Sequence, residues 1–178
     1  MGEPFDIVVA DPPWKFSSNS VAKPGRNAMR HYPCMSDMEI CALPVETWVG
    51  RDALLFLWTT APMLERSMAV YKDWGFKYVS QLIWIKDKVG TGFWVRNRHE
   101  IVLIAKRGKF PCPKPAPFGD SVITGQQREH SRKPEALQNQ IDIIWPHTRK
   151  LEMFARRARP GWTVWGNQID MFTRGATP

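Results

Sequence analysis

The feature that most constrains this chain is a short apolar run that ends in two consecutive prolines. The run Ile7-Val8-Val9-Ala10 has the length and composition of a buried strand, and Asp11-Pro12-Pro13-Trp14 follows it directly. Proline has no backbone N–H and a fixed φ, so the strand must end there and the chain beyond it is stiff. We therefore expect a rigid loop at the carboxyl end of a strand, where open α/β sheets bind their ligands.

This loop carries groups that suit a flat ring with an amino substituent. The Asp11 carboxylate and the Pro12 carbonyl can each accept one N–H, and the Trp14 indole can stack on the face of the ring. The simpler interpretation is that Asp11 only caps a turn. The prolines and the tryptophan beside it favour a site.

Apolar runs and amphipathic segments alternate along the rest of the chain. Beyond the strand at 6–10, strands are expected at 53–58, 78–86, 101–106, 150–154 and 162–166. Helices are expected from Ser36, which has capping-box spacing to Glu39, over 63–74, and from Pro134. The apolar face of the helix at 63–74 is expected to consist of Leu64, Met68 and Tyr71. This alternation predicts an α/β fold with a mostly parallel sheet, helices on both faces, and a single domain over residues 1–178.

Composition narrows the choice of partners. The chain has 25 Lys and Arg against 17 Asp and Glu, a formal charge of +8, which favours a nucleic acid or else only keeps the protein soluble. Cys34, Cys41 and Cys112 form no CxxC pair, so neither a metal site nor a disulfide framework is expected. With no secretory signal and no apolar run near the ~20 residues needed to cross a bilayer, we expect a cytoplasmic protein without membrane contact.

Two long polar stretches, at 15–35 and 107–133, are expected to be lids or binding loops because they are rich in Gly, Pro and charge. The first contains His31 and Tyr32. Basic runs at 106–109 and 156–159 are candidate phosphate contacts or, equally, ordinary solvated surface.

Four elements of the sequence together resemble one enzyme family. They are Asp11-Pro12-Pro13-Trp14, Gly92-Phe93-Trp94 with His99-Glu100, the run at 130–135, and Glu152-Met153-Phe154-Ala155-Arg156 followed by Gly166-Asn167-Gln168. In this order and spacing they are similar to the N6-adenine methyltransferases of the mRNA m6A-writer catalytic type, which have bacterial and phage members. The resemblance covers nearly the whole chain.

The resemblance implies S-adenosylmethionine (SAM) as cofactor and a Rossmann-like sheet. It implies a catalytic loop made of Asp11, Pro12, Pro13 and Trp14, with Asp11 also facing the cofactor. The remaining cofactor contacts that it implies are Lys133 to the methionine carboxylate, Phe154 along the cofactor, Arg156, and Asn167 and Gln168 to the ribose hydroxyls. It places Tyr32, with His31 beside it, near the target base.

The chemistry expected of such a site is methyl transfer to a weak nucleophile. The adenine amino group is a poor nucleophile because its lone pair is delocalised into the ring. We expect Asp11 and the Pro12 carbonyl to accept its N–H bonds and direct the lone pair at the methyl group, with Trp14 stacked on the purine. His99-Glu100 is expected to stabilise the start of a strand.

Two departures from the pattern predict weaker SAM binding than in larger relatives. Only Met1 to Phe5 precede the first strand, where those relatives have a segment that holds the cofactor's adenine, and Ala158 stands where some relatives have a histidine.

Three further questions stay open from the sequence. We expect DNA as the substrate before RNA, because a minimal single-domain member suggests a protein encoded by a bacterium or phage. A homodimer or partner subunit could complete the nucleic-acid groove. The alternative functions are a non-catalytic nucleic-acid-binding subunit and a methyltransferase for side-chain amides.

Overall fold

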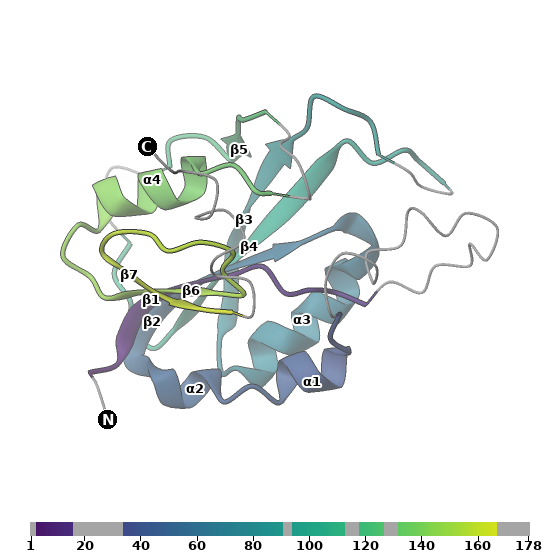
Figure 1. The fold of residues 1–178 in the computed structure, drawn as a ribbon. Coiled ribbons are helices and arrows are strands. Elements are labelled where there is room, and N and C mark those ends of the chain that lie inside the picture. The colour runs from purple at the N-terminus through teal and green to yellow at the C-terminus, as the bar shows by residue number, and fades with distance from the viewer. Residues whose placement is uncertain (1–2, 16–33, 91–93, 113–117, 127–131, 167–178) are drawn as a thin grey trace, which may run out of the picture.

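The computed structural model describes residues 3–15, 34–90, 94–112, 118–126 and 132–166. Their strands form one seven-stranded sheet in the order β5-β3-β4-β2-β1-β6-β7 (Figure 1). Pairs β1–β2, β1–β6, β6–β7 and β3–β5 are parallel, and only β2–β4 and β3–β4 are antiparallel. The expected α/β class with a mostly parallel sheet is therefore confirmed.

The strands lie close to the positions that the sequence predicts. Their bounds are β1 Phe5–Ala10, β2 Val49–Thr59, β3 Lys77–Ile85, β4 His99–Arg107, β5 Val122–Ile123, β6 Lys150–Met153 and β7 Trp162–Trp165. The helices are α1 Asp37–Cys41, α2 Val45–Trp48, the 3-10 turn η3 Ala61–Met63, α3 Leu64–Asp73 and α4 Ala136–Ile144. The short strand β5 lies inside the stretch that was expected to be only a loop, and α2 was not expected.

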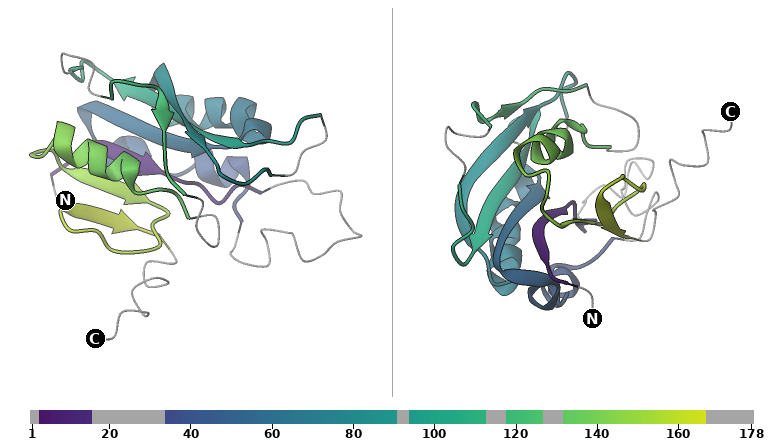
Figure 2. Two further views of the ribbon diagram at one scale, coloured as in Figure 1. Left: turned by 90° about the horizontal axis from the view of Figure 1, so that it is seen from above. Right: turned by 90° about the vertical axis from the view of Figure 1, so that its left-hand side faces the viewer.

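Alternation along β1 explains why both faces of the sheet are covered. Val8 and Ala10 belong to a buried cluster shared with α1 and α3, whereas Ile7 and Val9 belong to a second cluster shared with α4. Successive residues of a strand point to opposite faces, so a continuous apolar run serves two cores. Figure 2 shows α4 on one side of the sheet and the other helices on the opposite side.

Two local predictions have different outcomes. The capping box is confirmed, because Glu39 donates its backbone N–H to Ser36 Oγ at 3.3 Å and accepts the Ser36 N–H at 2.8 Å. The predicted apolar face of α3 is wrong at Met68, which is partly exposed, while Val70 and Tyr71 are buried. Val70 and Tyr71 belong to the buried cluster that α3 shares with β1, β2 and α1, whereas Met68 does not.

The order of strands brings distant segments to one edge of the sheet. β1, β2, β6 and β7 are mutually parallel, so their carboxyl ends share an edge. β4 runs antiparallel to β2, so its amino end, at His99 and Glu100, lies at that same edge. This edge therefore gathers the Asp11 loop, Glu100 and Phe154, and we call it the Asp11 edge.

Within the described residues, no helix is long and apolar enough to cross a membrane. In that same part of the chain, no group of three or more His, Cys, Asp or Glu side chains is placed to hold a metal ion.

Candidate active site

The Asp-Pro-Pro-Trp loop is held by its own backbone. Trp14 donates its N–H to the Pro12 carbonyl at 2.8 Å, and Met35 donates to the Pro13 carbonyl at 2.9 Å. The second bond ties the loop to the chain that enters α1. Because prolines offer no N–H of their own, these carbonyls depend on donors from elsewhere. The loop is thus fixed where it leaves β1.

Trp14 does not lie where the sequence suggested. The residue is 4% exposed, and its indole N–H donates to the Trp58 carbonyl at 3.3 Å inside the core. A side chain packed in this way leaves little surface on which a base could stack. The predicted stacking role does not fit this placement, and the indole anchors the loop to the end of β2 instead.

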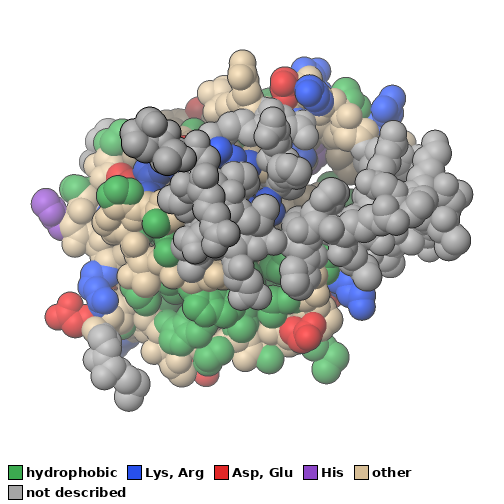
Figure 3. All heavy atoms as spheres, in the orientation of Figure 1, with side chains coloured by type: hydrophobic (Ala, Val, Ile, Leu, Met, Phe, Trp, Pro, Cys, Tyr) green, Lys and Arg blue, Asp and Glu red, His purple; other side chains and the backbone are tan. Residues whose placement is uncertain are grey.

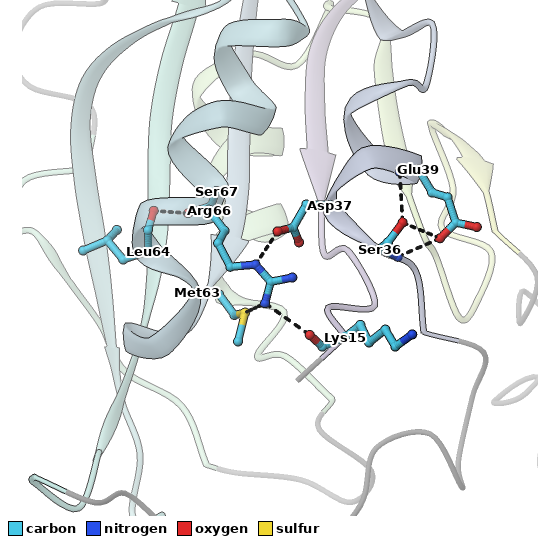
Figure 4. A network of polar contacts seen from close by, with 8 residues as sticks. All are labelled: Lys15, Ser36, Asp37, Glu39, Met63, Leu64, Arg66 and Ser67. Atoms are coloured by element: carbon cyan, nitrogen blue, oxygen red, sulfur yellow. Dashed lines mark hydrogen bonds and ion pairs between the residues drawn. The ribbon is translucent and has the colours of Figure 1, made fainter. Parts of the chain in front are cut away.

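A polar network secures the far end of the loop (Figure 4). Arg66 of α3 forms an ion pair with Asp37 of α1 and donates from Nη1 to the Lys15 carbonyl at 3.2 Å. Arg66 therefore bridges two helices and the residue that follows Trp14. Both ends of the loop are anchored, so Asp11 is presented on a rigid support.

Asp11 belongs to a chain of alternating charges. Its Oδ2 accepts a hydrogen bond from Lys133 Nζ at 2.8 Å, and the same ammonium is 3.2 Å from Glu100 Oε2. The other oxygen of Glu100 forms an ion pair with Lys86. Lys133 Nζ also lies 5.5 Å from the ring centroid of Trp58. These side chains come from the loop after β1, from β4, from the end of β3 and from the segment before α4.

Burial and charge act against each other in this chain, and charge prevails. Burial would lower the pKa of Lys133, but the carboxylates of Asp11 and Glu100 outweigh it and raise that pKa. Burial would raise the pKa of Glu100, but the ammonium groups of Lys133 and Lys86 outweigh it and lower that pKa. Lys133 and Glu100 therefore stay charged near neutral pH, as buried ions do when they are paired.

Four of the predicted site residues line one pocket. They are Asp11, Lys133, Phe154 and Arg156. Lys133 was expected to meet the cofactor carboxylate, and the structure places it against Asp11 and Glu100. Its predicted contact with SAM stays a prediction. The observed contact makes it the residue that orients Asp11.

The ends of β6 and β7 are joined at the rim of this pocket. Phe154 directly follows β6 with a left-handed φ of 61°, and its ring packs on Trp165 at 5.3 Å between centroids. Ala155 donates its N–H to the Trp165 carbonyl at 3.0 Å. A Cβ at Gly166 would lie 2.7 Å from the Ala155 backbone N, so only glycine fits this close approach.

The remaining predicted site residues lie outside the described part of the chain. They are His31, Tyr32, Asn167 and Gln168.

Sequence reasoning missed a polar pair inside the pocket. Gln138 of α4 donates from Nε2 to Glu152 Oε1 of β6 at 3.1 Å, and both residues line the pocket. Burial raises the pKa of Glu152, although the bond from Gln138 and the charge of Arg157 lower it in part. A glutamate between the apolar residues Leu151 and Met153 was the available signal, and only the packing of α4 on β6 reveals its partner.

The two basic runs have different positions. Arg157 pairs with Glu135 at 2.6 Å and Arg159 with Asp142 at 2.8 Å, and both arginines line the pocket. The run at 106–109 follows from the carboxyl end of β4, which is the opposite edge of the sheet. Only the run at 156–159 is therefore part of the candidate site.

Comparison with known proteins assigns the family. Residues 5–168 match the MT-A70 family. The chain belongs to the MT-A70 family. It is 29% identical to Type II methyltransferase M.MunI of a Mycoplasma species, over 96% of this chain and 82% of that protein. The family resemblance drawn from the Asp-Pro-Pro-Trp loop and its companion segments is thereby confirmed.

Larger relatives match through only a part of their length. The chain is 32% identical to an N(6)-adenosine-methyltransferase MT-A70-like protein of Arabidopsis thaliana and 29% identical to the N(6)-adenosine-methyltransferase catalytic subunit METTL3 of Homo sapiens. Each match covers 93% of this chain but 24% and 28% of those proteins, so the chain spans about a quarter of their length.

Proposed function

We propose that this chain transfers the methyl group of SAM to the N6 amino group of adenine in nucleic acid, with DNA as its first substrate. The observation that carries the proposal is the anchored Asp11 carboxylate, which lines the same pocket as Lys133, Phe154 and Arg156. MT-A70 family membership supports both the methyl donor and the adenine acceptor.

The residues present fit SAM. The pocket has both acidic and basic linings, and among its residues the side chains of Trp58 and Gln138 each contain a buried polar atom without a partner in the described part of the chain. A ligand with separate positive and negative groups suits such a lining. When bound, SAM supplies a methyl group that is already activated by its sulfonium.

The chain's own contribution is positioning. Lys133 holds Asp11 through Oδ2, so Oδ1 is the acceptor that can take one N–H of the adenine amino group. The Pro12 carbonyl already accepts the Trp14 N–H, and its second lone pair can take the other N–H. These two acceptors turn the nitrogen lone pair toward the incoming carbon, and the surplus proton leaves after transfer. Trp14 acts through the loop, and the predicted role of Tyr32 at the base stays a prediction.

The connection between β3 and β4 is the part of the described surface best suited to the nucleic acid. It leaves and re-enters the sheet at the Asp11 edge and projects away from it (Figure 1). Trp94 on it is 99% exposed, with Arg96 and Arg98 close by in sequence. Figure 3 shows Lys and Arg side chains at this end of the molecule, with others spread over the same face. An exposed aromatic among cations can stack on a base while the cations meet phosphates.

We test this surface with Trp94→Ala and with Ile143→Ala as a matched control. Ile143 is 74% exposed near the end of α4, next to Asp142, which pairs with Lys150 at the amino end of β6 and so at the edge opposite Asp11. Loss of one stacked base predicts about tenfold weaker binding of a labelled single strand for Trp94→Ala, and no change for the control. Equal affinities for both variants would remove Trp94 from the interface.

DNA is proposed first because M.MunI, a Type II methyltransferase, matches over most of its own length, whereas the adenosine methyltransferases match over about a quarter of theirs. If the substrate is a duplex, the target base must leave the stack, which costs a few kcal/mol. Single strands and mismatched sites are then the better substrates.

A homodimer or partner subunit that completes the nucleic-acid groove is a further part of the proposal, and light scattering with and without DNA tests it.

The deciding experiment uses SAM with a labelled methyl group. The chain is incubated separately with DNA, RNA and protein, and the products are digested and analysed by mass spectrometry. N6-methyladenine in DNA, absent with Asp11→Ala, is the expected result. Label only in protein amides, or none in any arm from a folded protein that binds SAM, would contradict the proposed function. Label only in RNA would overturn the choice of substrate.

A further inference from the structure

The chain closes on itself where the Asp-Pro-Pro-Trp loop ends. Trp14 and Met35 form a parallel β-bridge, in which Met35 donates its N–H to the Pro13 carbonyl at 2.9 Å and Lys15 donates its N–H to the Met35 carbonyl at 3.2 Å. Residues 16–33, between the two sides of this bridge, lie outside the described part of the chain. The bridge therefore sets the position of the segment that directly follows the two prolines.

Arg66 of α3 contacts the chain on both sides of the Trp14–Met35 bridge (Figure 4). Its Nη1 donates to the Lys15 carbonyl at 3.2 Å on one side, and its Nε forms an ion pair with Asp37, two residues beyond Met35, on the other. Figure 4 shows the Lys15 side chain pointing away from the guanidinium, so this contact depends on the backbone alone. One side chain thus joins the two sides of the bridge to a helix.

The elements behind these contacts are themselves fixed. Asp37 is the first residue of α1, and Ser36 before it is held by a reciprocal capping box with Glu39. Arg66 belongs to α3, whose Val70 is buried in the cluster shared with β1 and β2. The guanidinium therefore connects the bridge to a support that does not depend on the loop.

Local helix stability does not explain an arginine at this position. Arg66 lies in the first turn of α3, where the helix dipole disfavours a positive charge. Its ion-pair partner Asp37 is on another helix, and its third contact, Met63 Sδ at 3.1 Å from Nη1, is only a weak acceptor. A planar guanidinium offers a fork of donors at fixed spacing, whereas a lysine ammonium is a single point of charge. The residue type and its place therefore fit the bridge rather than the helix.

We propose that Arg66 is a positioning residue for methyl transfer, which fixes the Trp14–Met35 bridge and through it the two acceptors of the Asp-Pro-Pro-Trp loop. The path is short and stiff, because the bridge begins at Pro13, next to the Pro12 carbonyl, and prolines have a fixed φ. This rests on the proposed function in that the acceptors serve the adenine amino group. The described residues that line the pocket include neither Arg66 nor its ion-pair partner, so cofactor affinity should not depend on it.

The first test separates rate from affinity. Arg66→Met removes the guanidinium, and Lys72→Met removes the same charge from an exposed position on the same helix. Arg66→Met is expected to lower kcat by about tenfold to a hundredfold, as for a displacement of about 1 Å. The KM for SAM and the affinity for S-adenosylhomocysteine should stay within about twofold of wild type. Arg66→Lys keeps the charge without the fork and should recover only part of the lost rate. Lys72→Met is expected to leave rate and affinity unchanged.

The second test needs no methyl transfer. Hydrogen exchange of the Lys15 and Met35 amides, which both donate within the bridge, is expected to be about tenfold faster in Arg66→Met than in wild type or Lys72→Met. The amides of β1 should exchange as in wild type. The thermal midpoint should stay within about 4 °C of wild type, because a partly exposed ion pair contributes little stability.

The outcomes separate this inference from the proposed function. Unchanged kcat in a folded Arg66→Met variant, an equal loss in Lys72→Met, a loss of S-adenosylhomocysteine affinity as large as the loss of rate, or unchanged exchange at Lys15 and Met35 would each overturn the positioning role. A wild-type protein that binds SAM but forms no N6-methyladenine would overturn the proposed function. Faster exchange in Arg66→Met would in that case still support the hold of Arg66 on the bridge.

Discussion

Two charged clusters lie on the α4 side of the sheet, and they differ in how completely they are satisfied. The first is the chain Asp11–Lys133–Glu100–Lys86 at the Asp11 edge. The second surrounds Asp142 of α4 and ties the helix to β6 and β7. We call them the edge cluster and the Asp142 cluster.

The Asp142 cluster is closed. Oδ1 of Asp142 accepts from Trp162 Nε1 at 2.9 Å and lies 3.4 Å from Lys150 Nζ, and Oδ2 accepts from Arg159 at 2.8 Å. Burial would raise the pKa of Asp142, but the hydrogen bonds from Arg159 and Trp162 outweigh it and lower that pKa. With both oxygens in use, this carboxylate holds elements together and has little capacity for a ligand.

The edge cluster is open at one end. Lys133 and Glu100 are enclosed by their partners, but Asp11 uses Oδ2 for Lys133 and lines the pocket. A buried ion pair is a weak source of net stability, yet it fixes the position of its members. The comparison indicates that the edge cluster orients Asp11, whereas the Asp142 cluster holds α4 against β6 and β7. Variants in each should therefore separate activity from stability.

The largest expected effect is on activity at the open end. Asp11→Ala should reduce methyl transfer by about a thousandfold or more, because it removes an acceptor and its charge from the reacting group. The free energy of unfolding should change little, since Lys133 keeps Glu100 as a partner. Single-turnover methylation and urea unfolding measure the two quantities. An active variant would end the proposed mechanism.

Next in size is the loss of the shared carboxylate in the middle of the edge cluster. Glu100→Gln leaves Lys86 and Lys133 without their common partner and should lower the free energy of unfolding by about 3 kcal/mol, as for a broken buried pair. Urea denaturation measures it, with the exposed Glu65→Gln as control. A loss under about 1 kcal/mol would show that the pair is not effectively buried.

The contribution of Glu100 should also depend on pH. Its pKa is lowered in the folded protein, so its stabilisation is present above the ordinary glutamate pKa of about 4.3 and is lost as the pH falls through the lower folded value. The difference in unfolding free energy between wild type and Glu100→Gln should shrink in acid. Urea unfolding from pH 7 down to pH 3 follows it, and a difference that grows in acid would have the wrong sign.

The smallest effect is expected in the closed cluster. Asp142→Asn keeps an acceptor for Trp162 or Arg159 but loses the charge, so a loss of about 1–2 kcal/mol in unfolding free energy is expected. Affinity for S-adenosylhomocysteine should stay within about twofold of wild type, a difference under about 0.5 kcal/mol. A large loss of affinity without loss of stability would reverse the contrast between the clusters.

The local parts of the fold could be predicted from the sequence. The proline-terminated strand and the Ser36 capping box each depend on residues within a few positions. The antiparallel direction of β4 could not, because nothing within 99–107 states which way its neighbours run.

The site was predictable in its members and less so in their contacts. Lys133 and Asp11 were both expected there, but they are 122 positions apart, and only the folded sheet makes them partners. Burial of Trp14 is likewise a product of packing against β2. Gln138 and Glu152 were missed because their pairing requires α4 to cross β6.

Two hydrogen bonds between Lys86 and Arg98 close the base of the connection between β3 and β4. Lys86 donates its N–H to the Arg98 carbonyl at 2.9 Å, and Arg98 Nε donates to the Lys86 carbonyl at 3.0 Å. We expect that residues beyond these two hydrogen bonds can be exchanged without altering the strand order or the Asp-Pro-Pro-Trp loop. Because the proposed nucleic-acid surface lies on this connection, we predict that grafts made between positions 86 and 98 change target preference while the chemistry stays with the host.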